Sequence, residues 1–429
     1  MTVRKIRVDY LARVEGEVAL TVKLDGRVAT DLQLAVFEPP RFFEAFLRGR
    51  SMLEVPDITA RICGICPVAY QLAGAHAVED ALGVRLDPAL RSLQRLLMCG
   101  EWIESHALHV YMLHAPDFLG YPDGIAMAKD HPGRVRDGLR IKKTGNALVA
   151  ALGGREIHPV NVRVGGFYRA PATAELSALL PELRWSLGAA LEAIGWMRDL
   201  PFPDVERDYD LVALREPERY AMTEGRIVSS RGLDLAAGEY EREFVEEHVP
   251  YSNALFSRHH TGGAYLCGPL ARFNLNAAQL SAPAAEAAAA ARLEPPVLNP
   301  FKSLLVRMVE LVEAVAEAIR IIEAYTPPAR AGMELPHHAG TGAACVEAPR
   351  GLLFHRYEVA ADGTIKSARI TPPTSQNQRT MEEDIYHLAP HLADLPLPEA
   401  TRLAEQAIRN YDPCISCATH FLKLELQHA

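Results

Sequence analysis

Two cysteine pairs, placed near opposite ends of the chain, constrain its fold more than any other feature of the sequence. The first pair is Cys63 and Cys66, and the second is Cys414 and Cys417. Two residues between the thiols is the spacing that lets both sulfurs bind one ion. If one site takes all four thiolates, the first sixth of the chain must meet the last few residues. The long middle of the chain then becomes the frame of that site.

The thiolates alone leave the bound species open. Four sulfur ligands suit zinc, iron or another metal that accepts soft ligands, and a closed structural zinc site is the simplest alternative. Zinc modules usually bring their two pairs within about 15 to 20 residues of each other, however, and a chain of 429 residues does not need a metal to hold its core together. A redox-active disulfide within one pair is a further alternative.

The composition is that of an ordinary globular protein, with 49% hydrophobic and 23% charged residues. The formal net charge is -9 and no run is rich in Lys and Arg, which argues against nucleic acid as a partner. A membrane-spanning helix needs about 18 apolar residues. The most apolar stretches, such as 284–291, are much shorter. We therefore expect no membrane span.

The N-terminal segment and the cysteine content indicate a compartment. Residues 1–8 alternate in charge and contain no apolar run, so we expect no signal peptide. The chain has seven cysteines, an odd number, without the spacing of extracellular disulfide domains, and this fits a reducing environment. We expect a cytoplasmic protein.

The spacing of apolar residues predicts a mainly α-helical fold with small β-sheets at its edges (α+β), built as one large domain over residues 1–429. No repeat or low-complexity linker divides the chain. Two hairpins are expected, 6–37 and 351–370, each with an Asp-Gly turn. Segment 327–348 reads as a loop. Helices are expected at 40–50, 67–82, 89–114, 140–152, 176–200, 277–293 and 301–325, followed by short helices over 379–410.

Taken singly, the charged residues near these motifs are more often structural than catalytic. Glu15 in a half-buried strand could be solvated, Glu44 could be a helix-face carboxylate, and Arg350 could pair with any surface acid. His420 is a stronger candidate because it lies three residues after Cys417.

Five motifs together resemble the large, catalytic subunit of [NiFe]-hydrogenases. They occur in that family's order and span nearly the whole chain, so the match is far more specific than one cysteine pair. The sequence of residues 41–44 and the short length of the chain resemble the cytoplasmic, NAD(P)-linked or sulfhydrogenase-type members. The motifs are RVEG at 13–16, RICGIC at 61–66, GPLAR at 268–272, EAPRG at 347–351 and DPCISCATH at 412–420.

The resemblance implies a ligand set and a reaction. Cys63 and Cys414 would be terminal ligands of nickel, while Cys66 and Cys417 would bridge nickel to an iron that carries one CO and two cyanides. The reaction implied is the reversible heterolytic oxidation of H2, in which Cys414 takes the proton and Glu15 relays it outward. Nickel among thiolates can change oxidation state and zinc cannot, so the residue types agree with this chemistry.

The resemblance also implies groups around the metals. Arg350 is expected to point its guanidinium over the vacant metal position, with Asp117 and Asp412 fixing it. Thr374, beside Pro373, is expected to hydrogen-bond a cyanide.

A magnesium ion is implied near the C-terminus, with Glu44, His420 and a backbone carbonyl near Ile370 as ligands. Family precursors are commonly cleaved after the final motif histidine, whereas residues 421–429 follow it here. This tail is therefore a candidate for removal by a maturation endopeptidase. That endopeptidase and nickel-insertion proteins would then be partners of this chain.

One position departs from the family pattern. Four residues after the second cysteine the family often has histidine, and this chain has Tyr70. A hydrogen bond from this side to the sulfur of Cys66 or Cys417 is therefore in question.

The remaining cysteines indicate that electrons leave through another polypeptide. Only Cys99, Cys267 and Cys345 lie outside the two pairs, too few for a four-cysteine iron–sulfur cluster. The resemblance implies a small subunit with iron–sulfur clusters and, beyond it, diaphorase-type flavin and NAD(P) subunits. Two alternatives stay open: a sulfur or polysulfide reductase that uses the same centre, and a non-catalytic, zinc-bound or metal-free scaffold subunit, like the related subunit of respiratory complex I.

Overall fold

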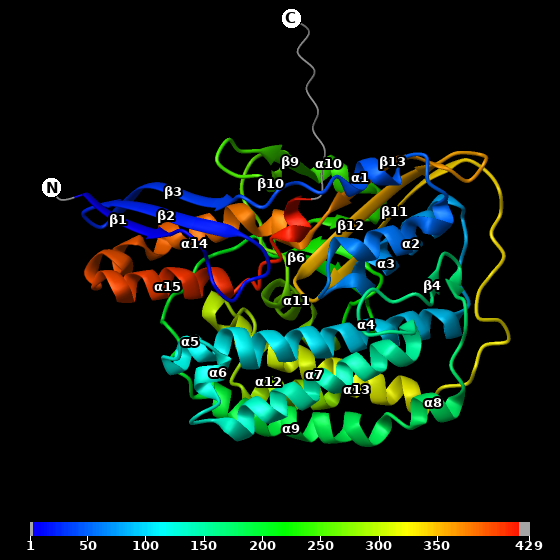
Figure 1. Cartoon of the computed structure of the whole chain (residues 1–429), viewed down its shortest axis with the longest axis horizontal. Helices are drawn as coiled ribbons and strands as arrows, with labels where there is room; N and C mark the ends of the chain where they lie inside the picture. The colour runs from blue at the N-terminus through cyan, green and yellow to red at the C-terminus, as the bar shows by residue number, and fades with distance from the viewer. Residues whose placement is uncertain (1–2, 420–429) are drawn as a thin grey trace, which may run out of the picture.

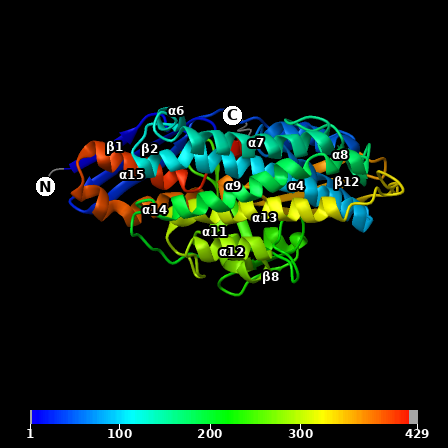
Figure 2. The same cartoon turned by 90° about the horizontal axis from the view of Figure 1, so that it is seen from below.

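A bundle of long helices forms one layer of the molecule, and small sheets lie over it (Figure 1). The computed structural model describes residues 3–419. The bundle contains α4 (Pro88–Leu108), α7 (Pro132–Gly153), α9 (Leu180–Arg198) and α13 (Ser303–Glu323), which lie side by side when seen from below (Figure 2). The predicted mainly helical fold with small sheets is confirmed.

The sequence explains where α4 begins. Asp87 caps its N-terminus, because the side chain accepts a hydrogen bond from the backbone N–H of Ala89 at 2.8 Å, and Pro88 occupies the first helical position, as predicted. The helix continues into a π-helical turn, His109–His114, before α5 (Ala115–Leu119). This turn brings His109 and His114 into the interior.

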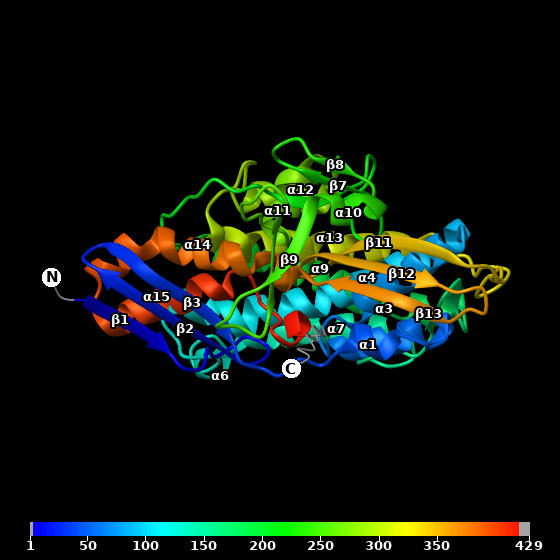
Figure 3. The ribbon, with the colours of Figure 1, turned by 90° about the horizontal axis from the view of Figure 1, so that it is seen from above.

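Two three-stranded antiparallel sheets occupy the upper layer (Figure 3). The first contains β1 (Val3–Val8), β2 (Val18–Asp25) and β3 (Val28–Val36), and the second contains β11 (Gly340–Ala348), β12 (Gly351–Val359) and β13 (Ile365–Thr371). Both predicted hairpin turns are present. The smaller strands are β4 (Val162–Arg163), β5 (Gly166–Phe167), β6 (Val212–Arg215), β7 (Arg226–Ser229), β8 (Asp234–Leu235), β9 (Phe244–His248) and β10 (Leu255–His259).

The packing of α3 and of the C-terminal helices brings the chain ends together. The helix α3 (Pro67–Ala81) packs against β11 and β12, and α14 (Pro373–Asp394) packs against β3. From α15 (Leu397–Arg409) the chain returns to the centre, where the turn η7 (Ser416–Thr419) lies between the two sheets (Figure 1). The shorter helices are α1 (Phe43–Leu47), α2 (Val55–Thr59), α6 (Gly124–Met127), α8 (Thr173–Ser177), α10 (Tyr240–Glu243), α11 (Pro269–Asn276) and α12 (Ala282–Ala290), with 3-10 turns at Met52–Glu54, Ala60–Ile62, Ala237–Glu239, Ala277–Gln279 and Pro300–Lys302.

The second sheet contains a strand that the sequence reading missed. Segment 327–348 was expected to be a loop, but its second half is β11, the partner of β12. A Cβ at Gly340 would lie 2.0 Å, and one at Gly342 2.1 Å, from the backbone of Ala81, so the glycines let this strand pack directly on α3. Glycine normally disfavours strands, and the pattern therefore resembled a loop.

Two helices are longer than expected. The helix α7 begins at Pro132, not at 140, and α14 is one helix from Pro373 to Asp394 where short helices were expected. A proline suits the first turn of a helix, so Pro373 begins α14 and does not prevent it. Within residues 3–419, no helix is long and apolar enough to cross a membrane.

Candidate metal centre

Four thiols converge in the interior, between the start of α3 and the turn η7. Cys66 is the residue that precedes α3, and Cys417 lies within η7. The sulfurs of Cys63 and Cys414 are 3.5 Å apart, and those of Cys63, Cys66 and Cys417 all lie within 4.8 Å of one another. Each of the four residues is at most 3% exposed. The structure thus brings the two ends of the chain to one buried site.

Four close, buried sulfurs can act together as the ligands of a cation. All seven cysteines lie within residues 3–419 and are free thiols. Contacts with the sulfurs of Cys414, Cys417 and Cys66 lower the pKa of Cys63, whereas burial raises the pKa of Cys414. Several thiolates cannot share a buried site without a positive charge between them. The donor set therefore fits thiophilic metal ions, including nickel and iron.

Glu15 contacts Cys414 and the residue that follows it. The Cys414 thiol donates to Oε2 of Glu15 at 3.1 Å, and the backbone N–H of Ile415 donates to the Glu15 carbonyl at 2.9 Å. Gly16 allows this approach, because its φ is +87° and a Cβ there would lie 2.7 Å from Cβ of Ile415. The 13–16 loop therefore packs on the loop of the second cysteine pair.

A serine and a second carboxylate continue from Glu15 toward the surface. The Ser416 hydroxyl contacts Oε1 of Glu15 and also Oε1 of Glu38, the latter at 2.6 Å. One hydroxyl has a single hydrogen, so Ser416 can donate to only one of the two carboxyl groups at a time. No role was predicted for Ser416 or Glu38 from the sequence, although Ser416 lies inside the motif at 412–420.

Arg350 reaches the cluster from the turn between β11 and β12. Its Nε donates to the Asp412 carbonyl at 2.5 Å, and its Nη2 donates to Oδ1 of Asp412 at 3.1 Å. Its Nη1 lies 3.9 Å from the sulfur of Cys66. Asp412 has a φ of +51°, a left-handed conformation that aspartate tolerates better than most residues. The structure thus places Arg350 beside the thiols and pairs it with Asp412.

We expected Asp117 to fix Arg350, but the two residues are not in contact. Its carboxylate accepts hydrogen bonds from Arg409 at 2.8 and 2.9 Å, from Arg13, and from His114 at 3.2 Å; among residues 3–419 no contact joins it to Arg350. Burial alone would raise the pKa of Asp117, but His114 and Arg409 outweigh it and hold this pKa below its usual range. Two arginines and a buried histidine packed around Asp117 therefore take the place of the expected partner, and Asp117 secures the 13–16 loop and the end of α15.

A buried ion network holds the turn that carries Arg350. Arg272, which is 0% exposed, donates to Glu310 at 2.7 and 2.8 Å, to Glu347 at 3.0 Å, and to the carbonyls of Ala348 and Pro349 at 2.8 and 2.9 Å. Burial raises the pKa of Glu310, but Arg272 outweighs it and lowers this pKa to about 2. Arg272 and Glu347 belong to two of the quoted motifs, but their ion pair was not predicted.

We expect Arg272→Met to destabilise the chain strongly, because it leaves Glu310 and Glu347 buried without a cation. The loss in the free energy of unfolding should be about 3–5 kcal/mol, measured by chemical denaturation of the metal-free chain. Arg140→Met is the control: it removes an equally well-formed ion pair with Glu182, at 2.9 Å, that is exposed, and it should cost at most about 1 kcal/mol. Equal losses in the two variants would contradict the structural role of Arg272.

Thr374 and Pro373 lie at the start of α14, beside the second cysteine pair. The Thr374 hydroxyl accepts a hydrogen bond from the backbone N–H of Cys414 at 3.0 Å, and its own hydrogen remains available for another acceptor. The Pro373 carbonyl lies 3.7 Å from the sulfur of Cys267. The role of the two residues toward a ligand of iron stays a prediction.

The expected magnesium ligands are only partly described. Glu44 is 8% exposed and accepts a hydrogen bond from the backbone N–H of Ile370 at 2.8 Å, so these two residues are neighbours, as the prediction requires. Burial raises the pKa of Glu44 to about 7. His420 and the tail 421–429 lie outside the described residues.

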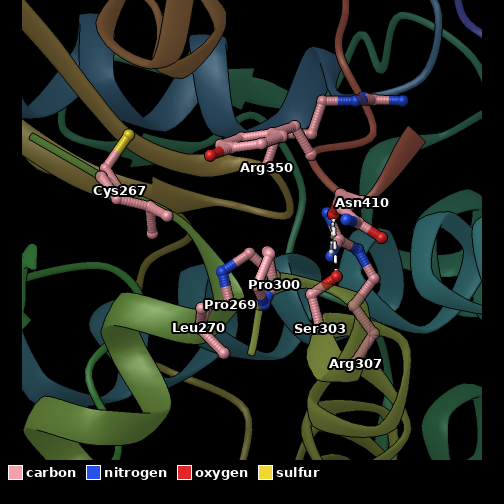
Figure 4. Close-up of a pocket in the computed structure, with 10 residues that line it drawn as sticks. Cys267, Pro269, Leu270, Pro300, Ser303, Arg307, Arg350 and Asn410 are labelled. Carbon is pink, nitrogen blue, oxygen red and sulfur yellow. Dashed lines mark hydrogen bonds between the residues drawn. The ribbon is translucent and has the colours of Figure 1, made fainter. Parts of the chain in front are cut away.

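A small cavity lies behind Arg350, between the turn it occupies and α13 (Figure 4). Its volume is about 20 Å³, room for one water molecule. Arg307 rises from α13 toward Asn410 and donates to the Asn410 carbonyl at 3.2 Å. The cavity is therefore next to the site but too small for an organic substrate.

Comparison with known proteins places these observations in a family context. The sequence profile described as nickel-dependent hydrogenase matches residues 41–132 and 273–420. Sulfhydrogenase 2 subunit alpha of Pyrococcus furiosus is 32% identical over 424 residues, covering 98% of this chain and 100% of that protein. The NAD-reducing hydrogenase HoxS subunit beta of Cupriavidus necator is 27% identical, with 98% of this chain and 95% of that protein covered.

Solved structures agree with the sequence relatives. An NAD+-reducing [NiFe]-hydrogenase in the H2-reduced state superimposes with a TM-score of 0.86 at 28% identity, covering 97% of this chain and 99% of that one. A [NiFeSe]-hydrogenase of Dm. baculatum superimposes with a TM-score of 0.79 at 20% identity, covering 98% and 100% of the two chains, and shows that the fold is shared.

Proposed function

Because the chain belongs to the family of nickel-dependent hydrogenases, we propose that it is the catalytic subunit of a heteromeric [NiFe]-hydrogenase that interconverts H2 with two protons and two electrons. The observation that carries the proposal is the Glu15 carboxylate on the Cys414 sulfur inside a cluster of four thiols. A structural zinc site needs no base beside its ligands. Heterolytic splitting of H2 needs a base beside the metal to take the proton.

The ligand assignment follows from the resemblance and fits the geometry. Cys63 and Cys414 would hold nickel, and Cys66 and Cys417 would bridge it to an iron carrying CO and two cyanides, with Thr374 donating to one cyanide. When bound, this group supplies a redox-active metal that changes oxidation state, which zinc does not. Supporting this assignment, the four sulfurs share one buried site and the Thr374 hydroxyl faces the Cys414 backbone.

The protein supplies the path for the proton. The Cys414 sulfur holds the proton first, and Oε2 of Glu15 receives it across 3.1 Å. Ser416 then accepts from one carboxyl group and donates to the other, which transfers the proton to Glu38. Glu38 is partly exposed, so the proton reaches solvent there. Each step joins groups within hydrogen-bonding distance.

Arg350 supplies a fixed positive charge beside the metals. Its two bonds to Asp412 orient the planar guanidinium, and a buried charge in this position acts strongly on any charge that develops during H2 splitting. Lysine could not form the same pair of bonds, because it has a single charged nitrogen and no fork of donors.

We expect Arg350→Lys to keep the metals and to slow H2 splitting by about 10²–10³-fold, the usual cost of losing one preorganised donor. Metal content and D2/H+ exchange should be measured on the same sample. Arg356→Lys is the control, because Arg356 pairs with Glu241 on the partly exposed face of β12 and should leave the rate unchanged. A rate within twofold of wild type in Arg350→Lys would contradict the role of Arg350.

Electrons would leave through an iron–sulfur subunit. Cys99, Cys267 and Cys345 are buried, and burial raises the pKa of each thiol. Gly64, which lies between the first two cysteines, is exposed. We therefore expect a cluster-bearing partner to dock over this loop, with diaphorase-type flavin and NAD(P) subunits beyond it. The similarity to the NAD-reducing hydrogenase HoxS subunit beta supports NAD(P) as the final acceptor.

Further parts of the proposal concern assembly. Glu44, the Ile370 carbonyl and His420 would bind Mg²⁺, and a maturation endopeptidase with nickel-insertion proteins would process residues 421–429. The absence of a basic run argues against nucleic acid as a partner, and free cysteines fit the reducing environment of the cytoplasm.

A second candidate function is the reduction of sulfur or polysulfide by the same complex. It is favoured by the 32% identity to a protein named sulfhydrogenase subunit alpha. The test supplies the purified complex with H2 and, in parallel, with NAD+, NADP+, an artificial dye and polysulfide. Hydrogenase activity predicts reduction of the dye, while product from polysulfide would add the second activity. No H2 consumption with any acceptor, from a complex with full nickel content, would contradict the proposal.

A further inference from the structure

Arg307, on α13, is a buried arginine without an acidic partner. Within residues 3–419, the arginines that are less than 2% exposed are Arg95, Arg272, Arg307 and Arg409. Three of these pair with a carboxylate: Arg95 with Glu317 at 2.5 Å, Arg272 with Glu310 at 2.7 Å, and Arg409 with Asp117 at 2.8 Å. In the same part of the chain no ion pair joins Arg307 to a carboxylate. A buried charge without a counter-charge is costly, so Arg307 needs an explanation.

Three nitrogen atoms beside the small cavity of Figure 4 have no acceptor within residues 3–419. They are Nε and Nη2 of Arg307 and Nδ2 of Asn410, and both side chains line the cavity. The remaining nitrogen of the guanidinium, Nη1, donates to the Asn410 carbonyl at 3.2 Å, as the Ser303 hydroxyl does at 2.9 Å. Buried donors in proteins are almost always hydrogen-bonded. These three therefore indicate an acceptor that is not part of the chain.

The lining of the cavity favours a negatively charged acceptor. None of its ten residues is acidic, and all of them are buried. The guanidinium of Arg350, which is one of them, is already bound to Asp412. All three unpaired atoms are donors. An anion can accept from several donors at once, whereas a water molecule has two hydrogens of its own that need acceptors.

Arg307 also keeps its positive charge at neutral pH. Burial lowers the pKa of Arg307 to about 10, which is still well above neutral pH. The charges farther away are mixed, because Asp412 and Glu310 stabilise the cation while Arg272 and Arg350 oppose it. An anion in the cavity would supply the counter-charge that the chain does not place against Arg307.

We propose that the cavity binds one monatomic halide ion, chloride in the cell, on Arg307 and Asn410. Its volume of about 20 Å³ admits a single atom-sized ligand and excludes phosphate, sulfate and carboxylates. Because every lining residue is buried, the ion enters as the chain folds and exchanges slowly afterwards. It neutralises Arg307 beneath the turn that carries Arg350. The inference does not depend on the reaction proposed above.

The first test is anomalous diffraction at long wavelength from crystals of the complex purified in sodium chloride. Chloride gives an anomalous peak at such wavelengths and a water oxygen does not. The Cys267 sulfur lines the same cavity and serves as the internal reference. We expect a second peak of similar height in the cavity, in contact with Arg307 and Asn410. Density for a water molecule without a peak would overturn the proposal.

The second test measures how chloride affects stability. The metal-free full-length chain is unfolded in urea, which brings no chloride, at equal ionic strength in sodium chloride or sodium gluconate. Gluconate is too large for the cavity. An ion that binds only the folded chain lowers the unfolding equilibrium constant about tenfold for each tenfold rise in its concentration above Kd. We expect this dependence in the wild-type chain.

Two variants make the chloride effect specific. Arg307→Met removes the charge on the cavity and should abolish the dependence on chloride. Arg140→Met is the control, because it removes an exposed arginine that pairs with Glu182 at 2.9 Å and should respond to chloride as the wild type does. Equal stability of the wild type in chloride and gluconate, or an unchanged chloride response in Arg307→Met, would overturn the proposal. If Arg307→Met does not fold, the diffraction from wild-type crystals and the wild-type chloride response still decide.

Discussion

Cys414→Ser is expected to abolish H2 turnover and to remove nickel from the purified complex. A serine hydroxyl keeps its proton at neutral pH and is a hard ligand, whereas nickel needs a thiolate here. The same change removes the sulfur that donates to Glu15 at 3.1 Å, so the first proton acceptor is lost with the ligand. The measurements are nickel content per chain and H2-dependent dye reduction.

Cys99→Ser is the matched control for this loss. Cys99 is 0% exposed like the ligands, but its sulfur contacts Met222 at 3.9 Å in the helical core. The control should keep nickel and activity, although it places a hydroxyl in an apolar site. Full nickel content and turnover in Cys414→Ser would show that the second cysteine pair does not hold the catalytic metal.

Glu15→Gln is expected to leave the metals in place and to suppress D2/H+ exchange by about 10²–10⁴-fold, the usual contribution of a positioned acid–base group. The amide can keep the contacts of the Glu15 side chain with Ser416 and Cys414 but cannot carry a proton between them. Infrared bands and metal content should match wild type, since Glu15 is not a ligand.

Glu17→Gln is the control for charge. Glu17 lies two residues further on and is exposed, and the change removes the same formal charge. We expect its exchange rate to equal that of wild type. If Glu15→Gln exchanges as fast as Glu17→Gln, the proton must leave Cys414 by another route, and the relay through Ser416 and Glu38 is wrong.

The sequence predicted that the two ends of the chain meet at one site. It did not predict the ion pairs and the strand packing around that site. Cysteine spacing is a local property, so the two pairs could be recognised without knowing the fold. The start of α4 was equally local, because Asp87 and Pro88 specify a helix N-terminus by themselves. The site could be anticipated to this extent because short motifs carry its ligands.

Features that depend on packing could not be predicted. Asp117 can pair with any arginine that the fold brings near, and the choice of Arg409 and Arg13 over Arg350 depends on how α5 packs against the end of α15. The strand β11 forms because Gly340 and Gly342 let it approach α3, while glycine in isolation indicates a loop. Ser416 gains its role only because Glu38 arrives from a distant segment.

The most direct test of the central claim is an infrared spectrum of the purified complex, with nickel, iron and zinc counted on the same sample. The account predicts one CO band and two cyanide bands together with one nickel per chain. A spectrum without these bands, from a sample that holds one zinc per chain, would contradict it and would leave a structural subunit that has kept the four cysteines.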